Sequence, residues 1–282
     1  MSYWIFRLKA AAISIVLLAV ILALWQVSTV SSNASTKNVV QDEYAALMGK
    51  SSVEKSNGFP SPEIFLTTSI KQLSEPFYDR GPNDKGIGIQ LGHSLWRVAL
   101  GYLIALLIAI PLGFVIGMSP LIYQALNPFI QILKPISPLA WMPLALYTIK
   151  DSNISGIFVI FICSIWPMLI NTAFGVAGVR KEWLNVAKTL EVGPFRKAFI
   201  VIFPAALPTI LTGMRISMGI AWLVIVAAEM LVGGTGIGYF VWNEWNNLSL
   251  PSVIFAVLMI GIVGMLLDTI FAQLQKKVTY AD

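Results

Sequence analysis

The chain has 282 residues, of which 57% are hydrophobic and only 12% are charged, and its formal net charge is +5. A soluble domain carries roughly 25% charged residues, so this composition excludes an ordinary water-soluble protein and indicates a membrane protein. The single cysteine, Cys163, excludes a disulfide framework, and within its apolar run it is interpreted as a small core residue.

Six segments are long and apolar enough to cross the hydrocarbon core of a bilayer, which takes about 20 residues. They lie near residues 10–28, 93–117, 125–149, 153–175, 207–231 and 253–275. The first follows Arg7 and Lys9 and has no small-residue cleavage site after it. We interpret it as a spanning helix, with an uncleaved signal anchor as the alternative. The sequence therefore predicts an all-α integral membrane protein with six transmembrane helices.

The basic residues cluster at the ends of the apolar segments and in the loop 176–206, which fits a membrane topology better than nucleic-acid binding. By the positive-inside rule this loop faces the cytoplasm, together with the N-terminal residues 1–9 and the C-terminal residues 276–282. An even number of crossings makes these three assignments agree. Residues 29–92 then form an external loop, which we expect to contain short interfacial helices.

Prolines interrupt the third apolar segment. Pro135, Pro138 and Pro143 fall within nine residues, and Lys134 directly precedes the first of them. In lipid a carbonyl freed by proline needs a new partner, so such breaks survive where other helices or a cavity supply one. We predict a bend beside a pathway, with Lys134 at the cytoplasmic end of a bent helix; a harmless kink is the alternative.

The cytoplasmic loop, residues 180–208, is the segment most informative about function, and it belongs to a predicted five-helix core over residues 93–275. Residues 182–190 predict a short helix at the start of this loop. Its apolar face consists of Trp183, Val186, Ala187 and Leu190.

A second short helix is predicted after Gly193 and Pro194. It opens at Phe195, carries Arg196, and is closed by Pro204 before the fifth span. Two short amphipathic helices outside the bilayer would present an apolar and basic protrusion that fits a groove on a soluble partner. The alternative is an interfacial helix that lies on lipid.

The same loop resembles the coupling loop of type I ABC importer permeases, whose consensus is Glu-Ala-Ala, three residues, Gly, nine residues, Ile, one residue and Leu-Pro. In this chain the matching positions are Asn185-Val186-Ala187, Glu191, Val201 and Phe203-Pro204. Only Ala187, the aliphatic Val201 and Pro204 keep the consensus type, so the loop departs from it at four positions.

A wider resemblance covers about residues 60–275. The segments HSLWRVALGYLIALLIAIPLG, KPISPLAWMPLALY, VAKTLEVGPF, FPAALPTILTGMRISMGIAWLVIVAAEM and GGTGIGYFVWNEWNNLSL are similar to the nitrate/nitrite, bicarbonate and sulfonate permeases of ABC importers. Nitrate is favoured within this branch, with bicarbonate and sulfonate as alternatives.

The resemblance implies a permease that works as a dimer with a second copy of itself in the bacterial inner membrane, surrounded by lipid. It also implies two cytoplasmic ATP-binding subunits, which carry ATP and Mg²⁺, and an external solute-binding protein. The resemblance also implies that residues of this loop contact the ATP-binding subunits. They are Trp183, Val186, Ala187, Leu190, Glu191, Gly193, Phe195, Arg196 and Pro204.

Ionisable groups inside the spans are candidates for function because they are costly there. Arg97 could donate forked hydrogen bonds to an incoming anion or extend to the headgroups. Arg215 could face the anion route or pair with another helix, whereas Glu229 lies too far along the same helix to be its partner. Asp268 is expected to pair with a basic residue.

A translocation route should bind its anion only weakly, because tight binding would slow release. Neutral and aromatic linings with one or two arginines satisfy this requirement. The predicted pathway residues are therefore Arg97, Trp141, Met142, Arg215 and Trp222, although packing explains a membrane tryptophan equally well.

Sequence motifs of enzymes are missing. No Gly-x4-Gly-Lys-Ser/Thr segment could hold ATP phosphates, and the glycine run 233–238 is interpreted as an external turn or re-entrant loop. With His93 as the only histidine, the sequence offers no zinc site and no Ser/His/Asp arrangement. We expect no catalytic residue, no metal and no bound cofactor. A secondary transporter or a membrane scaffold are the other classes considered.

Overall fold

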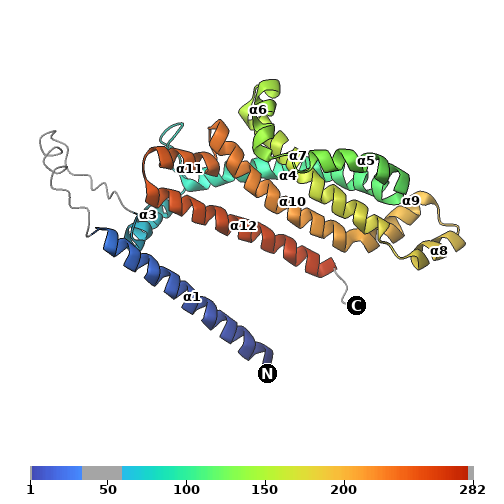
Figure 1. Cartoon of the computed structure of the whole chain (residues 1–282), viewed down its shortest axis with the longest axis horizontal. Helices are drawn as coiled ribbons and strands as arrows, with labels where there is room; N and C mark the ends of the chain where they lie inside the picture. The colour runs from blue at the N-terminus through green and yellow to red at the C-terminus, as the bar shows by residue number, and fades with distance from the viewer. Residues whose placement is uncertain (1, 34–58, 279–282) are drawn as a thin grey trace, which may run out of the picture. The chain divides into compact units, whose positions relative to one another are not determined.

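The computed structural model describes residues 2–33 and 59–278, and every regular element in these ranges is a helix (Figure 1). The all-α prediction is therefore confirmed, while residues 34–58 of the predicted external loop lie outside the described part. The chain divides into two compact units. One consists of Met1–Glu75 and Glu244–Phe255, and the other of Pro76–Asn243 and Ala256–Asp282.

The first unit contains two helices, α1 (Ser2–Asn33) and α3 (Pro62–Ser74). The apolar part of α1 runs over Ile5–Thr29 and includes the predicted first span. Trp25 near its end donates a 2.9 Å hydrogen bond to the Pro60 carbonyl oxygen. The short helix α3 lies within residues 29–92, and the Ser61 side chain caps its first turn. That this segment is external and interfacial stays a prediction.

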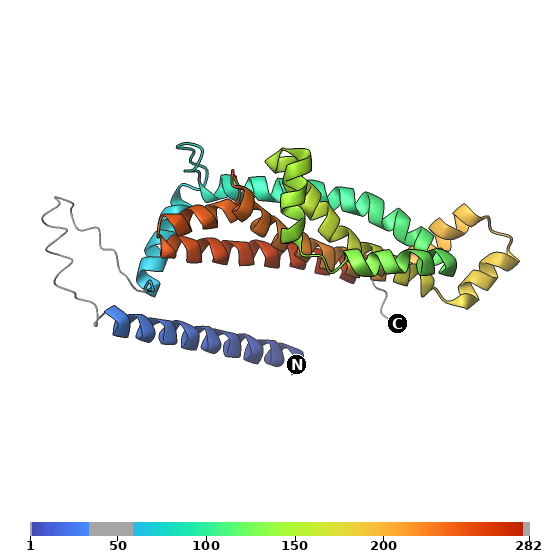
Figure 2. The ribbon, with the colours of Figure 1, turned by 45° about the horizontal axis from the view of Figure 1, so that its top comes forward.

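The second unit is built around three long helices, α4 (Ile87–Met118), α7 (Ser152–Ala177) and α10 (Phe203–Val232). They run side by side, with α7 in contact with both of the others (Figures 1 and 2). From Ala256 onward α12 (Leu250–Val278) also belongs to this unit, and it contacts α10 through the Trp222 indole, which donates to the Ile260 carbonyl oxygen at 2.9 Å.

Small residues spaced four apart allow α4 to approach α7 closely. They are Gly101, Ala105, Ala109, Gly113 and Gly117. A Cβ atom at Gly113 would lie 2.6 Å from the Thr172 Cβ atom, and one at Gly101 would lie 2.8 Å from the Ile157 carbonyl oxygen. Since lipid tails are as apolar as leucine, membrane helices associate through such close packing instead of through the hydrophobic effect.

The predicted third span is not one continuous helix. Two helices, α5 (Pro120–Leu133) and α6 (Pro138–Ile149), meet at an angle of 91°. Pro135 and Pro138 cannot donate a backbone hydrogen bond, so α5 ends at Lys134 and Pro138 opens the first turn of α6. The predicted bend is confirmed, but Pro143 does not interrupt the chain, because it lies inside α6.

The number of spans depends on how this bent pair is counted. Among the described residues, five helices are long and apolar enough to cross a bilayer, and the pair α5–α6 supplies a sixth crossing when it is taken as one span. The pair is arranged differently from the long helices, since α5 runs alongside them whereas α6 turns sharply away (Figure 2).

We predict that Gly113→Ala lowers the free energy of unfolding of the protein by about 1–3 kcal/mol, because the added methyl group forces α4 and α7 apart. Gly92→Ala in the same helix is the control, since nothing lies within 4 Å of its Cβ position. Thermal unfolding of the purified protein in detergent measures both. An unchanged midpoint for Gly113→Ala would contradict this close packing of α4 on α7.

Candidate functional site

The predicted coupling helix is present as α8 (Lys181–Thr189), with Glu182 in its first turn and Lys188 in its last turn. Both charges are placed favourably for the helix dipole. Trp183, Val186 and Leu190 are exposed, as an apolar face for a partner requires. Ala187 lies on the same side of α8 by its spacing from Trp183 and Leu190, but it is only 3% exposed, so it is covered and offers little surface to a partner.

The turn after α8 contains Glu191, which stands where the coupling-loop consensus has glycine. Glu191 has a φ angle of +50°, in the left-handed region that favours glycine. The backbone N–H groups of Glu191 and Val192 donate to the carbonyl oxygens of Lys188 and Ala187 and so close the helix. The fold therefore keeps the glycine-type turn without the glycine.

The second predicted helix of the loop is not a separate element. After Gly193, the helix α9 (Pro194–Lys197), the π-helical turn η1 (Ala198–Ile202) and α10 form one continuous helical run over Pro194–Val232. Pro204 was expected to end the segment, but it lies in the first turn of α10, where its missing N–H is tolerated. At this junction the Phe203 N–H donates to the Ala198 carbonyl oxygen.

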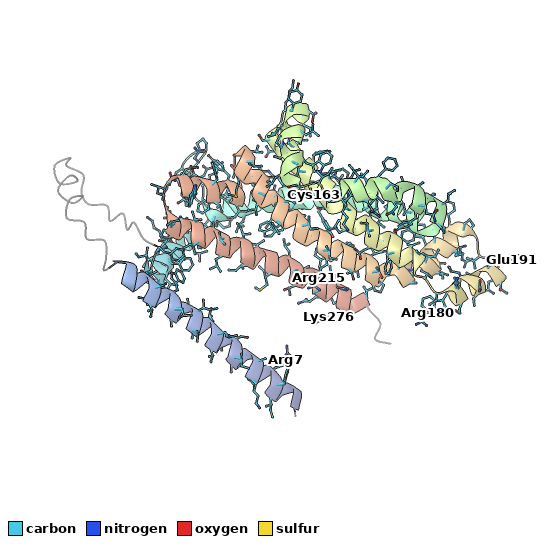
Figure 3. All side chains as sticks on the ribbon, in the orientation of Figure 1. Arg7, Cys163, Arg180, Glu191, Arg215 and Lys276 are labelled. Atoms are coloured by element: carbon cyan, nitrogen blue, oxygen red, sulfur yellow. The ribbon has the colours of Figure 1, made fainter. Side chains whose placement is uncertain are left out.

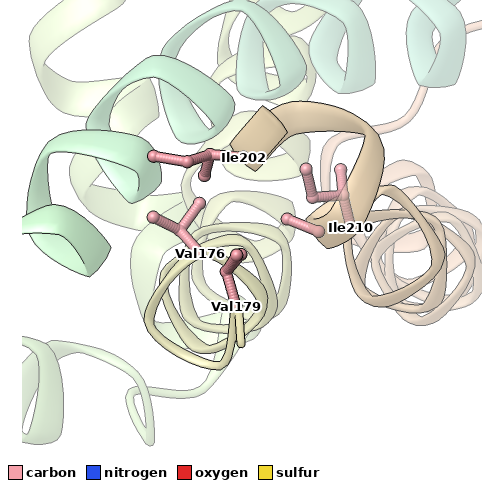
Figure 4. Packing of buried hydrophobic residues seen from close by; sticks show 5 residues of the cluster. Val176, Val179, Ile202 and Ile210 are labelled. Atoms are coloured by element: carbon pink, nitrogen blue, oxygen red, sulfur yellow. The ribbon is translucent and has the colours of Figure 1, made fainter. Parts of the chain in front are cut away.

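Buried aliphatic residues hold this loop to the long helices. Val176 and Val179, from the end of α7 and the segment after it, pack against Ile202, Ala206 and Ile210 (Figure 4). Leu184 of α8 and Phe203 pack on the same cluster. The loop is therefore supported by a packed base that fixes where its exposed residues point.

Several apolar side chains of this loop are exposed, and we call five of them the coupling surface. It consists of Trp183, Val186, Leu190, Phe195 and Phe199. Phe195 is 81% exposed and Leu190 is 70% exposed. Arg180 and Glu191 lie at the two ends of α8 in this loop (Figure 3). Contiguous exposed apolar groups bordered by charges are typical of protein interaction sites.

A buried polar cluster lies at the other end of the bundle, around the carboxylate of Glu229. Ser94 donates to both of its oxygens at 2.8 and 2.9 Å, and the Gly238 N–H donates to Oε2 at 3.0 Å. Arg97 Nη1 forms an ion pair with Oε1 at 2.7 Å. These donors replace the water that an ionised carboxylate would otherwise need.

The glycine run after α10 folds onto this cluster. The Gly236 N–H donates to Gln90 Oε1 at 2.6 Å, and the Ile237 N–H donates to the Ser94 hydroxyl at 2.9 Å. A Cβ atom at Gly236 would overlap the Glu229 carboxylate. The run is thus a tight connection between α10 and α11 (Ile237–Asn246), since its small residues allow the backbone to approach a buried charge.

The guanidinium of Arg97 is bonded to the protein on three sides. Besides the Glu229 carboxylate, Nη1 donates to the Thr235 carbonyl oxygen at 2.6 Å, and Nε and Nη2 donate to Asn153 Oδ1 at 3.0 and 2.5 Å. The side chain is buried, so the alternative in which it extends to the headgroups is wrong. A pocket of about 330 Å³ adjoins it, lined in part by His93 and Gly233. Its role in anion passage stays a prediction.

Arg215 pairs with another helix, which was one of its two predicted roles. Its Nε and Nη2 atoms donate to the two Asp268 carboxylate oxygens of α12, each at 2.6 Å. The expectation that Asp268 pairs with a basic residue is confirmed. This forked geometry matches the planar guanidinium to the carboxylate and satisfies both charges at once.

The remaining predicted pathway residues come from two helices. Met142 of α6 is buried beside Arg97 and Glu229, where it lines a void of about 10 Å³, barely enough for one water. Trp141 is half-buried on the same helix. Trp222 is buried at the contact of α10 with α12. The structure thus brings Met142 together with Arg97 at one void, whereas Trp222 lies at a separate contact, and the pathway role of all these residues stays a prediction.

Sequence reasoning missed the polar partners of this cluster. Gln90, Ser94 and Arg97 are spaced four and three apart, so they share one face of α4. That spacing in an apolar helix was the available signal. It could have indicated a buried polar contact, but not that Glu229 completes it.

Comparison with known proteins places this fold among the permeases of ABC importers. One chain of the MetNI methionine ABC transporter in an inward-facing form has a TM-score of 0.61 with 13% sequence identity, and the match covers 67% of this chain and 94% of that chain. At this identity the likeness shows the fold alone, which is that of a type I importer permease.

Sequence relatives give the family. Residues 87–280 match the family described as "Binding-protein-dependent transport system inner membrane component". The chain is 44% identical over 228 residues to the nitrate import permease protein NrtB of Synechocystis sp., covering 81% of this chain and 83% of that protein. It is 45% identical over 207 residues to the bicarbonate transport system permease protein CmpB of the same organism, covering 73% and 74%.

The chain belongs to this family of inner-membrane permease components. It is a multi-pass membrane protein of the bacterial inner membrane and a transport subunit of an ABC importer, a system that includes ATP-binding subunits and a solute-binding protein.

We predict that Glu229→Gln destabilises the permease by about 3–5 kcal/mol, because it leaves Arg97 buried without its counter-charge. Thermal unfolding in detergent measures the loss. The double variant Arg97→Met with Glu229→Met removes both charges, so it should lose less than the sum of the losses of the single variants Arg97→Met and Glu229→Met. Strictly additive losses would show that the two groups do not interact.

Proposed function

We propose that this chain is the permease of a nitrate and nitrite importer, and that two copies of it form the translocation pathway. The observation that carries the proposal is the 44% identity over 228 residues to a nitrate import permease. That match covers 81% of this chain and 83% of the nitrate permease.

The coupling surface is the proposed contact with the ATP-binding subunits. Its exposed aromatic and aliphatic groups are held outward by the packed base, and basic side chains such as Arg196 and Lys197 accompany them. A short amphipathic helix inserted into a groove is a recurrent mode of recognition between protein subunits. ATP and Mg²⁺ would bind to those partner subunits, since this sequence contains no phosphate-binding loop.

The proposed topology follows from the same surface. In this topology α8 faces the cytoplasm, and the positive-inside rule alone assigns the basic termini to that side, with Arg7 and Lys9 at one end and Lys276 and Lys277 at the other. The glycine run and the Glu229 cluster then lie toward the outer face, where an external binding protein would deliver the anion. Lipid surrounds the apolar exposed faces.

Bicarbonate is the second candidate substrate, because a bicarbonate permease is 45% identical over 207 residues. Nitrate and bicarbonate are both small, planar, monovalent anions with three oxygens, so one permease pathway suits either. The distinction therefore needs a transport measurement and not a comparison of sequences.

We expect Leu190→Asp to weaken binding of the ATP-binding subunits by about thirtyfold, as loss of an interface hot spot of about 2 kcal/mol does. The carboxylate of the introduced aspartate would lose its contact with water when the ATP-binding subunit covers it, and this loss opposes binding. Copurification of tagged permease with the ATP-binding subunits, followed by titration of the detached subunits, measures this.

Lys188→Ala on the opposite side of α8 is the matched control and should bind normally. Full binding by Leu190→Asp would overturn the assignment of this surface to the ATP-binding subunits, and the protrusion would then be assigned to the lipid interface.

For the substrate, we expect the complete complex in proteoliposomes to take up nitrate when ATP and the loaded binding protein are supplied on opposite sides. Nitrite, bicarbonate and taurine are assayed in parallel with labelled compounds. Uptake of nitrate or nitrite in preference to bicarbonate supports the proposal. Uptake of bicarbonate alone would replace nitrate by the second candidate, and uptake without ATP would contradict an ATP-driven importer.

A further inference from the structure

A large groove lies between α4, α5 and α7, at the end of the bundle from which α8 leaves. Its volume is about 740 Å³, which corresponds to roughly 25 water molecules. Part of its wall is apolar, including Leu169 and Phe174. None of the predicted pathway residues lines it.

The face of α5 toward this groove is polar. Tyr123, Asn127, Gln131 and Lys134 all line the groove, and their spacing of four, four and three places them on one side of the helix. The opposite side of α5 is apolar and exposed, and it carries Leu121, Phe129 and Ile132. A membrane helix with one polar and one apolar side is expected to lie between a hydrated space and lipid, since polar groups in a span avoid lipid.

Lys134 differs from the two arginines of the long helices. Arg97 is bonded to Glu229 and Arg215 to Asp268, whereas Lys134 forms no ion pair with any of residues 2–33 and 59–278. The lining of the groove contains no aspartate or glutamate at all. The groove therefore carries one net positive charge together with neutral hydrogen-bonding groups.

We propose that this groove is the inner half of the translocation pathway and that Lys134 is its anion-binding group. This inference rests on the proposed function, in which a small monovalent oxyanion crosses toward the side of α8. A single ammonium attracts such an anion, and the amides of Asn127 and Gln131 can donate to its oxygens. The apolar remainder of the wall keeps binding weak, so the anion can leave.

Lys134 also lies where the chain changes direction, because it ends α5 immediately before the 91° bend into α6. A movement of α5 relative to α6 would displace its ammonium group. The position suits a group that holds the anion in one state of the transporter and releases it in another.

The first test compares nitrate uptake by the complete complex in proteoliposomes. Lys134→Gln should lower the initial uptake rate about tenfold, as loss of one hydrogen bond to a charged group does, while Lys134→Arg keeps most of it. ATP hydrolysis by the assembled complex should persist in both variants, which separates a pathway role from a structural one. Lys150→Gln is the matched control, since Lys150 is exposed and does not line the groove.

The second test measures access from water. In a Cys163→Ala background, Lys134→Cys should react with a charged, membrane-impermeant thiol reagent applied from the side of α8, and nitrate should slow the reaction. Ile132→Cys on the apolar side of α5 should react much more slowly. No reaction at Lys134→Cys would mean that the groove is closed to water, and equal reaction of the two cysteines would mean that α5 does not separate lipid from a hydrated space. Either result would overturn the inference.

The two proposals can fail separately. Wild-type uptake of nitrate together with an unaffected rate in Lys134→Gln would overturn the inference and leave the proposed function intact. Uptake of another anion and not nitrate by the wild-type complex would overturn the proposed function. A loss of that other anion's uptake in Lys134→Gln would still support the anion-binding role of Lys134.

Discussion

An ionised carboxylate inside a membrane bundle must find in the protein the hydrogen bonds that water would give it, and the arrangement around Glu229 follows from this requirement. Its donors come from Ser94 and Arg97 of α4 and from the Gly238 N–H. Two parts of the chain that are more than 130 residues apart, α4 and the segment from Glu229 to Gly238, are thereby held together. The conformation of the glycine run is a consequence, because Gly236 must pass directly over the carboxylate.

The same reasoning separates the charges of the bundle by what they do. Arg97 and Arg215 each have a carboxylate partner, so their charge is neutralised within the protein and joins helices. Lys134 has no such partner among the described residues and lines a groove large enough to be hydrated. A transported anion needs an uncompensated positive charge, and a paired arginine offers little of one. Pairing therefore shifts the pathway hypothesis from the arginines to the lysine.

The apolar spans were predictable because a bilayer demands about 20 apolar residues whatever the fold. The bend at Pro135 and Pro138 was predictable for a similarly local reason, since proline lacks the N–H group. The pairing of Arg97 with Glu229 was not, because the two residues are 132 positions apart and only tertiary packing brings them together. The burial of Ala187 was not predictable, since helical spacing alone does not tell which residues of a face the neighbouring segments cover.

The continuity of the helical run over Pro194–Val232 has the largest mechanical consequence. It contains 39 residues and extends about 58 Å, so Phe195 of the coupling surface and Glu229 lie near opposite ends of one element. A displacement at Phe195 would therefore act on the same helix that carries Glu229. The π-helical turn Ala198–Ile202 is the one wide turn in this run, and such turns allow local adjustment. Because Arg215 ties the middle of the run to α12, a rotation about that turn would move both helices together.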